Sequence, residues 1–220
     1  MIRRSRRQAS RRREARTCRG RGQSLVEFAL ILPLFLLILL GMIDFGFAFY
    51  TNLTIEYASR EGARVGAALA AGNTLFPCDK VDSYVMAAVQ RVLESAGIAV
   101  DINRAGSGGV NWVRIYKSTD ANGNGYATGG NYNQWTYSAG SGPTVDGRVL
   151  DFVGPTESAA SWKACTRNNG ATPDSLGVAI SYTYGWITPV AQVPRTLGLG
   201  SFGQLSWVDK TVMALNPTTP

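Results

Sequence analysis

Two carboxylates interrupt the most apolar stretch of the chain. Glu27 precedes sixteen uncharged residues, Phe28 to Ile43, and Asp44 follows them, before a second apolar run that ends at Tyr50. An uncompensated carboxylate in lipid costs about 2.5–3.5 kcal/mol on insertion scales, so each acid needs a partner or a route to water. The chemistry open to them is charge pairing or contact with headgroups, on the cytoplasmic side for Glu27 and on the outer side for Asp44.

The remaining residues offer little to an enzyme. The chain has no histidine, which excludes His-based triads, metal sites and general bases. The segment from Asp120 to Gly125 resembles the start of a calcium loop, but its twelfth position is Asn131 instead of a bidentate Glu. An Asn-Gly turn is the simpler interpretation. We therefore expect no metal, no cofactor and no catalytic activity.

Two of the three cysteines, Cys78 and Cys165, lie beyond the apolar run, while Cys18 lies before it. In an oxidising compartment the two downstream residues would form one disulfide. In the chain-entropy model a loop of this length contributes on the order of 4 kcal/mol. Two buried free thiols are the alternative.

The positive charge is concentrated in front of the apolar run. Residues 1–22 hold ten arginines and one glutamate, a net charge of +9, so the other 198 residues carry −2 of a total of +7. Arginines neutralise phosphates, but this tail has no aromatic residue to stack on bases. The positive flank of a membrane helix explains it better and places the N-terminus in the cytoplasm. We expect no nucleic acid partner.

The apolar run is long enough to cross a bilayer once. Its uncharged part measures about 24 Å and the full run to Tyr50 about 34 Å, against a hydrocarbon core of about 30 Å. Phe45, Phe47 and Phe49 lie where an outer interfacial belt is expected. A secretory signal fits less well, because the core is too long and no small-x-small site clearly follows. The sequence predicts a transmembrane helix over residues 23–50.

Periodicity predicts the elements that follow the membrane. One helix continues over residues 51–71, and its small residues could pack on its own domain or on a neighbouring subunit. A second amphipathic helix is expected from about Asp79 to Ala96. Strands are expected at residues 98–102, 110–116, 176–186 and 204–215, an irregular loop at 118–147, and a short helix at 156–166.

These elements predict an α+β fold, in which an N-terminal transmembrane helix continues into a long amphipathic helix packed on an antiparallel sheet. The expected parts are a cytoplasmic Arg-rich leader (1–22), the transmembrane helix (23–50), its extracytoplasmic extension (51–71) and an extracytoplasmic α+β domain (72–220).

Three ordered motifs resemble the TadE-like family, minor pilins or pseudopilins of the Tad (Flp-type) pilus machinery. The motifs are Gly22-Gln23-Ser24-Leu25-Val26-Glu27-Phe28-Ala29-Leu30 followed by Pro33, then Asp44-Phe45-Gly46, then Ala58-Ser59-Arg60-Glu61-Gly62-Ala63-Arg64-Val65-Gly66-Ala67. The same resemblance implies a pilin-like arrangement of helix and sheet.

The resemblance also implies processing and partners. A prepilin peptidase would cut between Gly22 and Gln23, leaving Glu27 at the fifth mature position, followed by Phe28, to pair with the α-amino group of an adjacent subunit. Further implied partners are other pilins and pseudopilins and the Tad inner-membrane assembly platform. The protein would be a single-pass cell-membrane protein, pilus-associated after processing. The alternative is a membrane-anchored surface-binding, adhesin-like domain whose leader is kept.

Overall fold

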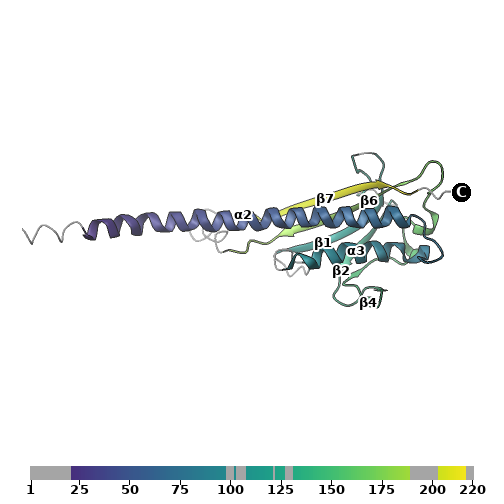
Figure 1. Cartoon of the computed structure of the whole chain (residues 1–220), viewed down its shortest axis with the longest axis horizontal. Helices are drawn as coiled ribbons and strands as arrows, with labels where there is room; N and C mark the ends of the chain where they lie inside the picture. Colours follow the sequence, from purple (N-terminus) through teal and green to yellow (C-terminus); the bar gives the residue numbers. More distant parts are fainter. Residues whose placement is uncertain are drawn as a thin grey trace, which may run out of the picture.

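The computed structural model describes residues 21–97, 102, 108–120, 122–126, 131–188 and 203–216. The 49-residue helix α2 (Arg21–Leu69) forms a shaft that projects from a head, and the head packs against the second part of the shaft (Figure 1). The predicted α+β fold is confirmed. The leader before residue 21 and most of the strand expected at residues 98–102 lie outside the described residues.

The head combines a short helical layer with antiparallel strands. Its helical elements are η1 (Cys78–Lys80), α3 (Val81–Ser95), η3 (Glu157–Ala159) and η4 (Ala164–Thr166). Its strands are β1 (Gly109–Lys117), β2 (Tyr132–Tyr137), β3 (Thr144–Val145), β4 (Arg148–Val149), β5 (Phe152–Val153), β6 (Ser175–Tyr184) and β7 (Leu205–Ala214).

Helix α2 ends where the sequence predicted, within two residues of position 71. Ala70 and Gly72 both adopt left-handed backbone angles, with φ of 48° and 85°. A Cβ at Gly72 would lie 2.6 Å from the backbone nitrogen of Cys78, so glycine is needed there for space as well as for conformation. This turn directs the chain back along α2 as α3.

The main sheet has five antiparallel strands in the order β5-β2-β1-β6-β7. Strand β6 lies between β1, where Ile180 faces Val113, and the edge strand β7, where Ile180 faces Asp209. The alternation that predicted β6 is confirmed, and its residues 176–184 are all buried. Val178 and Leu176 of β6 approach Gly62 and Gly66 of α2, so the core lies between this sheet and the helices.

Two glycines allow α2 to approach its neighbours closely. A Cβ at Gly62 would lie 2.6 Å from Cγ2 of Val89 on α3, and one at Gly66 would lie 2.8 Å from Cδ2 of Leu176 on β6. Ala63, between them, is fully buried. The small residues of this stretch therefore pack on their own domain, which settles an alternative that the sequence left open.

The last strand, β7, closes the core against α2. Ser59 on α2 donates its hydroxyl to Oδ2 of Asp209 at 2.6 Å, and its oxygen lies 2.9 Å from Oγ1 of Thr211. Beyond β7, the amide of Asn216 donates to the carbonyl of Ala67 at 2.9 Å. The first helix and the final strand of the described chain are thus direct partners.

Two local predictions were wrong. The stretch 118–147, expected to be irregular, contains β2 and β3, because the polar residue Asn133 is buried on the core face of β2 and hides the apolar alternation. The helix expected at 156–166 is two 3-10 turns, η3 and η4, and Ala160 between them is extended with φ −65° and ψ 135°. In the first segment Asn133 bonds to distant residues, and in the second the Glu157 carboxylate accepts the amides of Ala164 and Cys165 across the break at Ala160.

Candidate assembly and anchoring site

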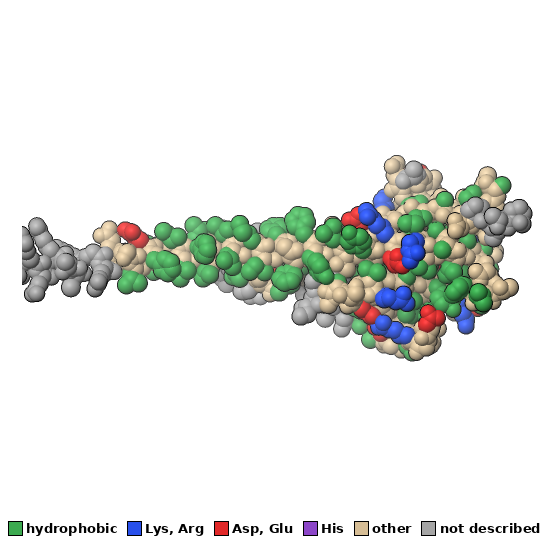
Figure 2. Space-filling view, in the orientation of Figure 1, with side chains coloured by type: hydrophobic (Ala, Val, Ile, Leu, Met, Phe, Trp, Pro, Cys, Tyr) green, Lys and Arg blue, Asp and Glu red, His purple; other side chains and the backbone are tan. Residues whose placement is uncertain are grey.

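Helix α2 divides into two parts with different surroundings. Residues 22–43, the free half, contain no buried side chain, whereas residues 44–69, the docked half, carry buried residues along one face. Figure 2 shows apolar side chains covering the visible side of the shaft, with charged side chains gathered on the head. Among the described residues, α2 is the one helix long and apolar enough to cross a membrane.

The start of the free half brings together the residues expected at the processing site. Gly22, Gln23, Glu27 and Phe28 are all exposed, and a Cβ at Gly22 would have no neighbouring atom within 4 Å. The Gln23 side-chain amide donates to Oε1 of Glu27 at 3.2 Å, one helical turn away. The Glu27 carboxylate is accordingly open to solvent, lipid or another chain.

Asp44 has a partner that neither sequence interpretation included. Its side chain is 1% exposed, and Oδ1 accepts hydrogen bonds from the amides of Ile187 at 3.1 Å and Thr188 at 3.2 Å. Oδ2 accepts from the Thr188 hydroxyl and, at 3.3 Å, from the same amide. The carboxylate is therefore turned into the head, where backbone donors compensate its burial.

Tyr184 adds a second contact at this position, because its hydroxyl donates to the backbone carbonyl of Asp44 at 3.2 Å. Burial raises the pKa of Tyr184 to about 12, and the negative charge of Asp44 adds to the effect. Trp186 lies edge-on to both Tyr184 and Phe45, with ring centroids 5.9 and 6.1 Å apart. The chain after β6 is thus fastened to α2 by polar and aromatic contacts.

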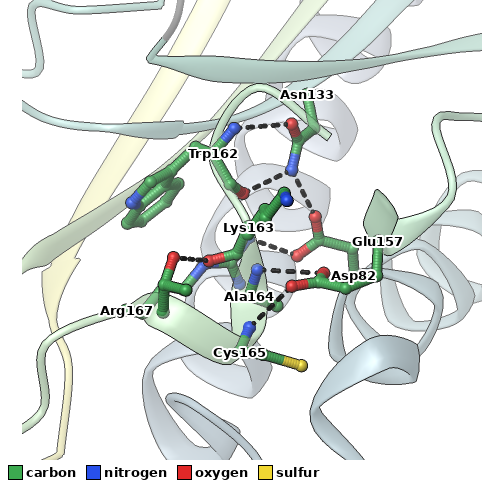
Figure 3. A network of polar contacts seen from close by, with 9 residues as sticks. Asp82, Asn133, Glu157, Trp162, Lys163, Ala164, Cys165 and Arg167 are labelled. Carbon is green, nitrogen blue, oxygen red and sulfur yellow. Dashed lines mark hydrogen bonds and ion pairs between the residues drawn. The ribbon is translucent and has the colours of Figure 1, made fainter. Parts of the chain in front are cut away.

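At the opposite end of the head, a disulfide joins η1, just before α3, to η4. The Cys78 and Cys165 sulfurs are 2.01 Å apart. The Glu157 carboxylate accepts the backbone amides of Ala164 at 3.0 Å and Cys165 at 2.9 Å (Figure 3). These bonds fix the loop on which Cys165 lies.

A buried ion pair holds the same segment. The Arg167 side chain has no exposed surface, and its Nη2 lies 2.6 Å from Oδ1 of Asp82 on α3. Its guanidinium also stacks 4.2 Å from the Trp162 ring. Asn133 on β2 donates to Oδ2 of Asp82 at 2.7 Å and to the Trp162 carbonyl at 2.8 Å, and accepts from the Trp162 amide at 3.1 Å (Figure 3).

Sequence reasoning missed this network because its members are far apart in the chain: Arg167 is 85 residues from Asp82, and Asn133 is 29 residues from Trp162. No motif or period links them. The sequence signal that could have suggested a buried ion pair is Arg167, two residues after Cys165.

The calcium-like loop is a turn stabilised by its own aspartate. Oδ1 of Asp120 accepts the amides of Asn122 and Asn124 at 2.9 and 3.2 Å, and Oδ2 accepts the Asn124 side chain at 2.6 Å. Hydrogen bonds from Asn124 lower the pKa of Asp120. The residues that the structure describes contain no group of three or more potential metal-binding Cys, Asp or Glu side chains.

In the described residues, one long apolar N-terminal helix carries an α+β head, an arrangement that suits an N-terminal membrane anchor. Residues 22–64 match the family described as TadE-like protein. The match confirms the resemblance seen in the three motifs and relates the chain to the Tad pilus machinery. It ends inside α2, so residues 65–220 lie outside it. No curated protein and no solved structure matches the chain.

Proposed function

We propose that this protein is a minor pilin or pseudopilin of a Tad-type pilus, cleaved by a prepilin peptidase after Gly22 and anchored by α2 until it is assembled. The supporting observation is the order of features along α2. Gly22 and Glu27 stand within the TadE-like segment, at the start of an exposed apolar helix. The head serves a structural role in this proposal.

Leader removal has a clear electrostatic consequence. Residues 1–22 carry ten arginines and a net charge of +9, and such a flank retains a membrane helix with its N-terminus in the cytoplasm. Cleavage removes this barrier and leaves the new α-amino group of Gln23. The helix can then be withdrawn from the bilayer and packed against other apolar helices.

Glu27 provides the assembly contact in this scheme. In the interior of a helical filament its carboxylate would be desolvated, so it needs an opposite charge. The α-amino group of an adjacent subunit supplies that charge, because every cleaved subunit brings one amine and one carboxylate to the same end of α2. Other pilins and the inner-membrane assembly platform are the partners that this pairing requires.

The test is the mass of the chain purified from membranes of cells that express the Tad machinery. We expect a protein that begins at Gln23, and we expect Gly22→Val to retain the leader. Gly41→Val is the matched control, because both glycines lie in open space on α2, and it should be cleaved normally. An intact leader, or a start other than Gln23, would overturn the processing step and favour the membrane-anchored adhesin-like alternative.

A further inference from the structure

The segment formed by the last residue of β6 and the four residues after it, 184–188, is held on α2 at the boundary between its two halves. We call it the clamp segment. Asp44 accepts hydrogen bonds from the amides of Ile187 and Thr188 and from the Thr188 hydroxyl, and the Tyr184 hydroxyl bonds to the Asp44 carbonyl. Figure 1 shows this part of the chain running from β6 along α2 toward the N-terminal end of the shaft.

The position of Asp44 along the helix coincides with the end of the exposed apolar stretch. From Phe28 to Ile43 that stretch holds no charge and measures about 24 Å at 1.5 Å per residue. Because the Glu27 side chain at its start can reach the inner headgroups, the stretch suits a hydrocarbon core of about 30 Å. Beyond it, Asp44, Ala48 and Thr51 are buried against the head. If the free half fills the bilayer, Asp44 and the clamp segment lie at its outer surface.

Among the described residues around the clamp segment, Asp44 is the charged one. Residues 45–55 of α2, residues 184–188 and residues 203–208 contain no Asp, Glu, Lys or Arg, and Tyr184 pairs with Leu205, which places the start of β7 at the same level. Several of these side chains are apolar and exposed: Phe45 55%, Phe49 69%, Tyr50 48%, Ile187 52% and Leu205 38%.

This surface has exposed aromatic and aliphatic side chains and no exposed charge, so it suits the boundary between headgroups and acyl chains better than water. We propose that the clamp segment is a second membrane contact of this protein, with Ile187 in the outer lipid interface and Asp44 as the buried acceptor that holds it there. The inference rests on the membrane placement in the proposed function. It adds that the head sits on the bilayer at a height fixed by Asp44.

Depth-dependent fluorescence quenching tests this contact. In a Cys18→Ser background, which keeps the Cys78–Cys165 disulfide, a bimane probe is attached at Ile187→Cys, Leu36→Cys or Leu75→Cys. Each labelled full chain is reconstituted into phosphatidylcholine vesicles with brominated acyl chains. Leu36 lies within the free half, and Leu75 is 80% exposed beyond the far end of α2. We expect strong quenching at Leu36, at least threefold more quenching at Ile187 than at Leu75, and little at Leu75.

The three probes separate two kinds of failure. If the Leu36 probe is quenched but the Ile187 probe is quenched no more than the Leu75 probe, the clamp inference is overturned. The membrane span is then left intact. An unquenched Leu36 would overturn the span in the proposed function, and the inference with it.

Asp44 is tested with the same Ile187 probe. Asp44→Ala removes every side-chain acceptor from the clamp segment, so we expect quenching at Ile187 to fall to the Leu75 level. Asp44→Asn keeps one acceptor oxygen and should give an intermediate value. Unchanged quenching in Asp44→Ala would overturn the positioning role. If that variant fails to fold, Asp44→Asn carries the test, and quenching at Ile187 equal to that of the unsubstituted chain would overturn the role.

Discussion

The two halves of α2 belong to one continuous helix but have opposite surroundings. Residues 22–43 bury no side chain, while residues 44–69 bury Ile55, Ala58 and Ala63 completely. The free half needs lipid or other helices to cover it, whereas the docked half is covered by α3, β6 and β7 of its own chain. The free half can therefore move from lipid to contact with other helices while the docked half keeps its contacts with the head.

The largest expected effect is on the head that covers the docked half, with the free half unaffected. Asp82→Ala leaves the buried Arg167 without its counter-charge, and breaking a buried pair in this way costs about 3–5 kcal/mol. Urea unfolding of the detergent-solubilised full chain should show this loss in the head. Carbonate extraction should still find the protein in the membrane. Loss of membrane association in this variant would mean that the two halves are not independent.

Arg64→Ala is the control for that substitution. Its pair with Glu61 is exposed and lies on the docked half, so we expect only a small loss of stability, because solvent screens the pair. A loss comparable to that of Asp82→Ala would show that burial does not explain the difference.

A Gly→Ala substitution in each half of α2 compares how closely the two halves are packed. Gly66→Ala puts a methyl group 2.8 Å from Cδ2 and 2.9 Å from Cδ1 of Leu176, so the core must shift at a cost of about 1–3 kcal/mol. Gly41→Ala meets no atom within 4 Å, and we expect unchanged head stability. Urea unfolding of both variants measures the difference, and equal values would contradict close packing at Gly66.

The smallest predicted effect concerns the free half. Glu27→Gln keeps the shape of the side chain but removes its charge, so cleavage should remain largely intact while incorporation into sheared pili falls about tenfold, equivalent to about 1.4 kcal/mol. Glu61→Gln is the matched control, since Glu61 is a carboxylate on the docked half that pairs with Arg64. Equal incorporation of both variants would count against charge pairing by Glu27.

The sequence predicted those features that depend on local pattern. The apolar length of the free half, the period of α3 and the alternation in β6 each identify an element within a few residues, because periodicity reports which face of an element is apolar. Other features depend on contacts between residues far apart in the chain. These features are the side of the sheet on which α2 lies and the segment that reaches Asp44, where Asp44 and Thr188 are 144 residues apart.

Polar residues are the ones whose surroundings the sequence left open. Asn133 suggests a loop when its sequence neighbours alone are considered, yet it is buried in β2 because Asp82 and Trp162 satisfy its amide. Asp120 suggests a metal ligand, yet its oxygens are occupied by Asn122 and Asn124. In both cases the decisive information is the identity of the hydrogen-bond partner, which composition and spacing do not contain.

The pairing of the final strand with the first helix determines when the head can be completed during export. In the proposed orientation α2 enters the membrane first and β7 crosses last. Until β7 arrives, Ser59 lacks Asp209 and Thr211, and the amide of Asn216 has not reached Ala67. The core therefore closes only after translocation of nearly the whole chain, and a chain truncated before β7 would expose both the Ser59 face of α2 and one edge of β6 outside the cell membrane.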